Sequence, residues 1–278
     1  MTTLPFWPTL RAAYSFTFRD LERLTSIAGL WLIVFVAIGI GSLWRAETGP
    51  VGDGEHLVAA LAQFAAIAGF AVAWNRAVLN NEFWALRFGM RELRFLVHGL
   101  VIMFGMIAVL RHGGMLLLLL LTAGILASGA YPVPWERMLI FQIAATIILL
   151  GPFSGLLLAL PAVAQDEQSA VFSAAWRRSR GSRLLIFYGT ILAIAPFEVL
   201  EMIKQAFLGE PLLPAYAYDG NVPVSQASAA ARYLAEAADG AIYFLGTAVA
   251  IAFLSSAYRR LAGEAPPLRS TTAARPGT

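Results

Sequence analysis

Five ionisable residues interrupt the apolar stretches of this sequence at places where they could do chemistry. Glu198, Glu201 and Lys204 follow one another at intervals of three residues, and Arg111 and His112 are adjacent in another apolar region. Such side chains are costly inside a bilayer and mark candidate substrate or proton pathways. If the surrounding segments cross a membrane, these five residues form a candidate intramembrane polar cluster in its outer half.

This polar cluster allows two interpretations. In the first, a polar cavity open to the outer side holds a substrate or passes protons, as in a secondary transporter or a channel. In the second, Arg111 pairs with Glu198 or Glu201 and fixes helix packing, because pairing makes a membrane charge tolerable. Lys204 and Asp239 then lie among the outer headgroups. The rise of an α-helix places Arg111 and Glu198 at a similar depth, roughly 21–24 Å from the cytoplasmic ends of their helices.

Other kinds of chemistry have little support in the sequence. The three histidines are scattered and form no HExxH motif, and no serine lies in a G-x-S-x-G pattern. Cysteine is absent, which excludes disulfides and thiolate metal sites. We therefore expect no catalytic residue, no metal and no cofactor, and an intramembrane enzyme is the least supported class.

The composition places the chain in the membrane class. Hydrophobic residues make up 59% of the 278 residues and charged residues only 13%, whereas soluble domains carry about a quarter charged residues. The net charge of +3 is divided into short arginine groups between apolar spans. This distribution does not form the single basic face of a nucleic-acid-binding protein, so we expect no nucleic acid partner.

Six apolar stretches predict membrane-spanning helices, each of which needs about 20 residues to cross a bilayer. The expected spans are 24–44, 56–79, 95–130, 138–163, 184–208 and 240–258. The third is too long for one upright crossing and is broken by Arg-His-Gly-Gly, so we expect one tilted or kinked helix with an interfacial extension. A crossing that starts nearer residue 100 is the alternative. The predicted fold is an all-α, polytopic transmembrane helical bundle.

Basic residues predict the orientation of this bundle. With the N-terminus inside, fifteen of the twenty basic residues fall in cytoplasmic segments, as the positive-inside rule requires. The first span lacks a small-residue cleavage site, which indicates an uncleaved anchor. We expect one transmembrane domain over 1–262, a disordered tail over 263–278, and both termini in the cytoplasm.

Two groups of arginines are candidate contacts for anionic lipid headgroups. In RFGMRELRFL, residues 87–96, three arginines lie on one stripe, which predicts a helix lying in the headgroup layer. Arginine suits this role because its planar fork pairs with phosphate oxygens. The alternative is that these charges only fix topology. The candidate residues are Arg87, Arg91, Arg94, Arg177, Arg178, Arg180 and Arg183.

Short similarities within the chain suggest three tandem units. FRDLERL at 18–24, MRELRFL at 90–96 and, more weakly, SRGSRLL at 179–185 each precede an outward-going span. The inward-going spans end alike in AWNRAVL at 73–79 and AYRRL at 257–261. We expect three parallel repeats, 8–80, 82–165 and 169–262, each an interfacial helix followed by two spans. Alternatively, the segments resemble one another because they meet the same interfacial requirement.

The RELRFL-type segment and the W-R-x-S-R-G-x-R turn at 176–183 carry a resemblance to known proteins. The chain resembles bacterial inner-membrane proteins of the YciC-like group and the membrane domain fused to some glycerophosphodiester phosphodiesterases. The resemblance implies a non-catalytic inner-membrane protein in envelope or lipid homeostasis or membrane scaffolding. No soluble phosphodiesterase domain and no acidic/His metal cluster occur here, so no catalytic residue carries over. Mitochondrial carriers also contain three two-helix repeats, but their motif fails at PFEVLE, 196–201.

Overall fold

The computed structural model describes residues 4–49, 52–82, 89–115, 135–165, 167, 171–208 and 229–263, and within them it contains helices and no strand. The α-helices are α1 (Phe6–Arg19), α2 (Leu21–Thr48), α3 (Asp53–Asn80), α4 (Met90–Ala108), α6 (Trp135–Leu150), α7 (Ala159–Ala164), α8 (Val171–Arg178), α9 (Arg183–Leu208) and α10 (Ala229–Leu261). A π-helical turn, η1 (Val109–Gly113), continues α4, and a 3₁₀ segment, η2 (Gly151–Leu158), joins α6 to α7.

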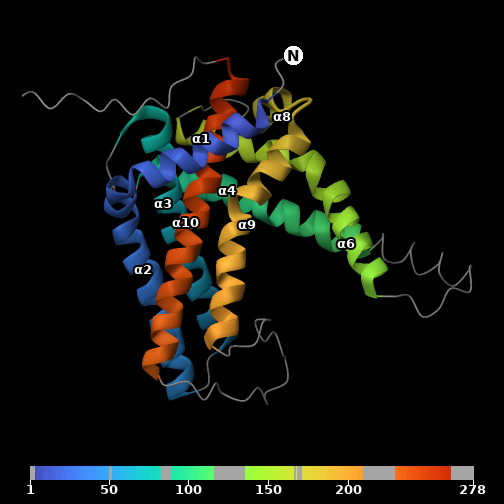
Figure 1. Ribbon diagram of the computed structural model, residues 1–278. Coiled ribbons are helices and arrows are strands. Elements are labelled where there is room, and N and C mark those ends of the chain that lie inside the picture. Colours follow the sequence, from blue (N-terminus) through green and yellow to red (C-terminus); the bar gives the residue numbers. More distant parts are fainter. Residues whose placement is uncertain are drawn as a thin grey trace, which may run out of the picture.

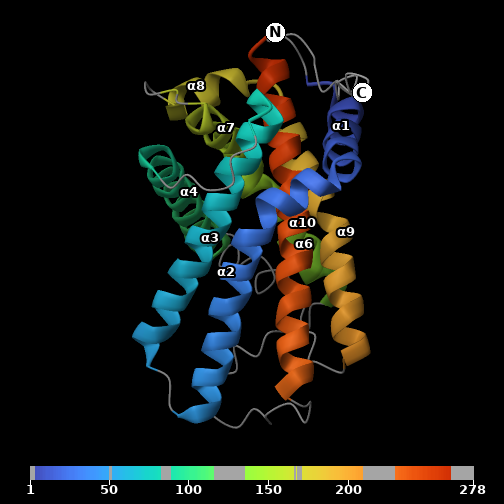
Figure 2. The same ribbon diagram turned by 90° about the vertical axis from the view of Figure 1, so that its left-hand side faces the viewer.

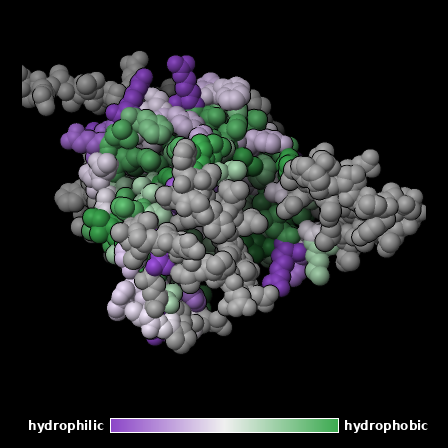
Figure 3. All heavy atoms as spheres, turned by 60° about the horizontal axis from the view of Figure 1, so that its bottom comes forward, coloured by the Kyte–Doolittle hydropathy of each residue, from purple (hydrophilic) through white to green (hydrophobic). Residues whose placement is uncertain are grey.

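The predicted six-span, all-α bundle is confirmed. Six segments of the described chain are long and apolar enough to cross a membrane, and each overlaps one predicted span. They are Leu21–Ala46, Gly54–Asn80, Met90–Gly113, Ile143–Ala164, Arg183–Lys204 and Arg232–Leu261. On the face that Figure 3 draws, patches of hydrophobic residues lie between hydrophilic ones.

The long helices α2, α3, α9 and α10 run side by side, whereas α4 and α6 lean away from them (Figures 1 and 2). α8, the N-terminal end of α1 and the C-terminal end of α10 lie at one end of the molecule, which we call the α8 end. The C-terminal ends of α2 and α9 lie at the opposite end, which we call the far end. The two halves of the bundle are named after these ends.

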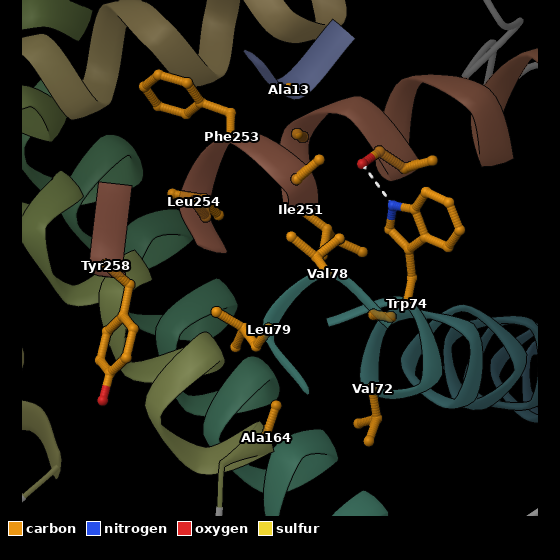
Figure 4. Packing of buried hydrophobic residues seen from close by; sticks show 14 of the residues in the cluster. Ala13, Val72, Trp74, Val78, Leu79, Ala164, Ile251, Phe253, Leu254 and Tyr258 are labelled. Atoms are coloured by element: carbon orange, nitrogen blue, oxygen red, sulfur yellow. Dashed lines mark hydrogen bonds between the residues drawn. The ribbon is translucent and has the colours of Figure 1, made fainter. Parts of the chain in front are cut away.

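The densest packing lies in the α8 half, where α3 meets α10. Trp74 and Phe253 are fully buried there, and the Trp74 indole Nε1 donates a 2.9 Å hydrogen bond to the Ala248 carbonyl oxygen (Figure 4). Asn75 and Ser255 add a buried side-chain hydrogen bond of 2.7 Å between the same two helices. Because a buried indole and a buried amide need partners, these bonds fix how α3 and α10 face each other.

Helix α1 lies across α9 and α10 and is tied to a kink in α9. Pro196 has no N–H, so the carbonyl oxygen of Leu192, four residues earlier, loses its helical donor. The Tyr14 hydroxyl donates to this carbonyl at 2.8 Å, with a second contact to the Ala193 carbonyl at 3.1 Å. Tyr14 of α1 therefore supplies the hydrogen-bond donor that Pro196 lacks within the fifth span.

The third span begins earlier than the sequence predicts, and its start corrects one interpretation. Residues from Met90 onward form the first turns of α4 itself, so the predicted separate interfacial helix over RFGMRELRFL is wrong from that residue on. Glu92 accepts the Gly89 backbone N–H at 2.8 Å and caps the start of α4 there. Residues 90–96 therefore belong to the same helix as the rest of the span. Residues 83–88 and 116–134 lie outside the described residues.

Two of the three predicted tandem units contain the expected series of helices. α1–α2–α3 and α8–α9–α10 each contain a short surface helix followed by two spanning helices. The middle unit contributes α4 and the interrupted span α6–η2–α7, and the position of its predicted surface helix includes residues outside the described ranges. Internal duplication therefore stays a prediction, and the predicted disordered tail after residue 263 also lies outside the described residues.

Candidate functional site

Arg178 belongs to a network that joins three segments at the α8 end. Its guanidinium donates to both carboxylate oxygens of Glu167 at 3.0 Å and to the Tyr258 hydroxyl at 3.2 Å. The Tyr258 hydroxyl in turn donates to Glu167 at 2.6 Å. This arrangement connects the segment after α7, helix α8 and the end of α10.

The charges in this network stabilise one another. Burial raises the pKa of the Glu167 carboxyl, but hydrogen bonds from Arg178 and Tyr258 outweigh it and leave the pKa below its ordinary value. The hydrogen bond to Glu167 also raises the pKa of Arg178. Arg178 was a candidate lipid contact, and the structure places its guanidinium on protein groups.

Arg76 forms a second network, in which it holds both ends of the chain between α3 and α4. It is buried, and its Nε donates to Glu82 at 2.9 Å while its Nη1 lies 3.7 Å from Glu92. The hydrogen bond from Arg76 is the main cause that lowers the pKa of Glu82. One guanidinium thus fixes the residues on either side of segment 83–88, which contains the candidate lipid contact Arg87 outside the described residues.

The other candidate lipid contacts on α4 and α9 are also partly used within the protein. The Arg183 guanidinium lies 3.4 Å from the Trp176 ring centroid and donates to the Trp176 carbonyl oxygen at 3.0 Å. Arg91 and Arg94 are half-buried in the first turns of α4, and the Arg94 Nε donates to the Met90 carbonyl oxygen at 3.3 Å.

Arg177 and Arg180 differ from these neighbours. Both are exposed, and neither side chain forms a hydrogen bond or an ion pair within the part of the chain that the structure describes. Arg180 lies in the turn between α8 and α9, which Gly181 closes with a φ of +86° that only glycine adopts without strain. Of the four candidates at the α8–α9 turn, these two present free guanidinium groups to the surroundings.

The predicted intramembrane cluster is divided between two places. Lys204 pairs with Glu201 at 2.9 Å and with Asp239 of α10, which ties α9 to α10 in the far half. Arg111 and His112 lie on η1 and are exposed. Glu198 is exposed on α9, within electrostatic range of the Tyr243 hydroxyl.

The predicted pair of Arg111 with Glu198 or Glu201 does not form among the described residues. η1 packs against α6, whereas α9 packs against α10, η2 and α1, so the two helices do not face each other. Helical rise gives the depth of a residue but not the direction in which its helix leans. The leaning of α4 away from the long helices separates the partners that the sequence suggested (Figure 1).

A hollow lies between α2 and α3 at the far end and is lined by Ile38, Gly41, Ser42, Arg45, Glu55 and His56. Arg45 and Glu55 face each other there at 3.4 Å, and His56 lines the same hollow. Within the described ranges no three His, Asp or Glu residues gather as a metal site would require. The hollow therefore offers a single exposed ion pair and no ligand set for a metal.

Glu167, Tyr258, Arg76 and Glu92 are site residues that sequence reasoning missed. One signal could have found Tyr258, because AYRRL at 257–261 resembles AWNRAVL at 73–79. The aromatic residues of these segments, Trp74 and Tyr258, are both buried and both hydrogen-bonded across to another segment. The similar ends of α3 and α10 thus predict two anchoring aromatics and not a ligand site.

No protein-family model, curated protein or solved structure matches this chain. A function must therefore be argued from the residues and geometry of the molecule itself.

Proposed function

We propose that this chain is a non-catalytic integral protein of a bacterial inner membrane that binds anionic lipid headgroups. Its α8 end faces the cytoplasm, and its role is in envelope or lipid homeostasis or in membrane scaffolding. The six spans support the membrane assignment, and the fifteen basic residues assigned to one side support the orientation.

The observation that carries the lipid-binding proposal is the pair of free side chains Arg177 and Arg180 directly before a helix with an exposed apolar stripe. Leu184, Tyr188 and Ile191 are exposed and lie at intervals of four and three residues on α9, which begins three residues after Arg180. This spacing keeps them on one face of the helix, where lipid chains would contact them. A guanidinium one turn beyond such a stripe lies at the height of the lipid phosphates.

Arginine at this position favours phosphate over neutral groups. Its planar fork donates two parallel hydrogen bonds to phosphate oxygens. Each basic residue near an anionic membrane surface contributes about 1 kcal/mol of attraction. Two free arginines in one turn therefore favour anionic lipids by a measurable margin, whereas Arg178 is occupied by Glu167.

Arg178 provides the matched control for a binding experiment. The purified protein in detergent would be mixed with phosphatidylglycerol or phosphatidylcholine, and bound lipids would be counted by native mass spectrometry. We expect the double variant Arg177→Gln/Arg180→Gln to lose its preference for phosphatidylglycerol and to keep its melting temperature. Arg178→Gln should keep the lipid preference and lower the melting temperature.

Equal binding of both lipids by the wild-type protein would contradict the proposal. So would an unchanged preference in the double variant, because the arginines would then only fix topology. The melting temperature separates these results from a failure to fold.

A second candidate function, secondary transport, is favoured by the irregular backbone of the middle unit. The third span contains the π turn η1, and the fourth contains eight residues of 3₁₀ helix, longer than such runs usually are. Interrupted spans of this kind line the binding sites of many transporters. The test is proton flux in proteoliposomes that enclose a pH-sensitive dye. Flux equal to that of protein-free liposomes would remove this candidate for proton-coupled substrates.

A further inference from the structure

Two helices of the bundle present apolar stripes that the rest of the described chain leaves uncovered. On α4 the stripe contains Val97, Val101, Phe104 and Ile107, all of them close to half exposed or more. These residues recur every three or four positions, so they share one face. In a membrane protein such a face contacts lipid or another protein.

Each stripe contains one charged residue in its far part. At the end of α4 it is Arg111 of η1, which follows Phe104 and Ile107 at intervals of seven and four residues. On α9 it is Glu198, which lies between the exposed residues Ile191 and Met202 at intervals of seven and four. The Arg111 side chain has no ion pair or hydrogen bond among the described residues, and Glu198 has no cationic partner there.

An isolated charge on a lipid-facing stripe is expensive, and proteins keep such residues when a partner neutralises them. The two charges here are of opposite sign. The end of α4 lies at the level of the middle of α9 in Figure 1. Arg111 lies on η1, which continues that end, and Glu198 lies near the middle of α9, so the two residues have a similar depth. They nevertheless lie on different sides of the molecule, with α4 on one side and α9 on the other in Figure 2.

We propose that Arg111 of one copy pairs with Glu198 of a second copy of this chain, and that the α4 and α9 stripes form the interface between them. Charge complementarity at equal depth is the reason for choosing a second copy as the partner. The apolar residues around both charges supply the packing surface, because helices associate in lipid through close contacts and polar bonds.

This contact joins two different surfaces, so it is heterologous. A pair of copies then keeps one free α4 stripe and one free α9 stripe, and addition continues until a ring closes. A closed ring would neutralise every Arg111 and every Glu198. The proposal does not depend on lipid binding or on the orientation of the α8 end, so either can fail without the other.

Charge exchange tests the pair directly. Association would be measured in liposomes by energy transfer between labelled copies, for the wild type, Arg111→Glu, Glu198→Arg and the double variant. We expect each single variant to weaken association by about tenfold or more, and the double variant to restore it, because the pair is then re-formed with reversed signs.

The Arg45–Glu55 pair is the matched control, because it has the same residue types and lies within one copy. Arg45→Glu should leave association unchanged. The proposal is overturned if the wild type does not associate, or if the double exchange associates no better than the single variants.

A second experiment avoids changing the charges, so that a folding defect cannot imitate the result. The chain has no cysteine, which allows single cysteines to be introduced without background. Chains carrying Ile107→Cys would be mixed with chains carrying Met202→Cys in liposomes and oxidised. We expect disulfide-linked dimers from the mixture and few from either variant alone. Equal dimer yields from the single variants, or none from the mixture, would contradict a contact between α4 and α9.

Discussion

Helix α3 changes character along its length, and this change divides the molecule into two halves. From Ala66 to Leu79, in the α8 half, nearly every residue is buried, and Trp74 and Phe70 are completely enclosed. In the far half, Leu57, Val58 and Leu61 of the same helix are 47–67% exposed. α10 shows the same burial in the α8 half, where residues 248–258 are almost all enclosed.

Most ion pairs follow the same division; the exception is Lys204, whose side chain is enclosed between Glu201 and Asp239 in the far half. In the α8 half, arginines are enclosed with their carboxylates, as in the Arg76 and Arg178 networks. In the far half, the Arg45–Glu55 pair is about half exposed, and Glu198 and Arg111 face outward. The α8 half therefore has the interior of a folded protein, whereas the far half leaves its surface to lipid or to other chains.

The largest expected effect comes from removing the central aromatic side chain of the α8 half. Trp74→Ala deletes a fully buried ring and its hydrogen bond to Ala248, so we expect a loss of about 3–5 kcal/mol. Leu57→Ala in the far half should cost less than about 0.5 kcal/mol, because that side chain is already exposed. Reversible unfolding in mixed micelles measures both values, and equal losses would refute the difference between the halves.

A comparison of two ion pairs sharpens the same contrast. Arg76→Met leaves the Glu92 carboxylate buried without its cation, which should cost about 3 kcal/mol. Arg45→Met breaks a pair whose side chains are 47% and 51% exposed, which should cost at most about 1 kcal/mol. The same unfolding measurement applies, and a larger loss for Arg45→Met would reverse the conclusion.

Replacing one glycine by alanine in each half should change the stability of the protein in opposite directions. A Cβ at Gly189 would overlap the enclosed Phe253 ring, so Gly189→Ala should destabilise the protein by about 1–3 kcal/mol. A Cβ at Gly41 meets nothing within 4 Å, so Gly41→Ala should stabilise α2 by about 0.5–1 kcal/mol. Thermal unfolding in detergent would show the melting temperature fall in one variant and rise in the other.

The smallest expected effect is a pH dependence that originates in the α8 half. The folded pKa of Glu167 and that of Glu82 lie below their ordinary value of 4.5. Their stabilisation is therefore complete above about pH 4.5 and is lost as the pH falls through the lower folded values. The melting temperature should be flat from pH 7 to 5 and should fall at lower pH. Glu167→Gln and Arg178→Gln should both reduce this fall, because each removes the same interaction.

The sequence predicted the spans well because length and apolarity decide them. All six were found. The largest difference within the described residues is at the start of the sixth span, which begins at Arg232 and not at residue 240, because Arg232, Glu236 and Asp239 lie in its first turns. The start of α4 was misjudged for the same reason, since Arg91, Glu92 and Arg94 made the first turns of a span resemble a surface helix.

The candidate site was harder to predict because its partners are distant in the sequence. Tyr258 lies 91 residues from the Glu167 that it contacts, and no spacing rule connects them. The sequence also could not distinguish Arg178, which binds Glu167, from the adjacent Arg177, which is exposed. Identical residue types in one turn take different roles because of the direction in which each leaves the helix.

The bond from Tyr14 to the kink in α9 has a consequence for biosynthesis. Tyr14 is translated before the carbonyl groups that it binds, which follow 178 and 179 residues later. The surface that α1 occupies also includes α10, which is translated last of the spans. Helix α1 therefore cannot take its final position until α9 and α10 have entered the membrane. In a chain truncated before Leu192, α1 has no acceptor for Tyr14 and stays unpacked. Limited proteolysis should then cleave α1 faster in the truncated chain than in the full chain.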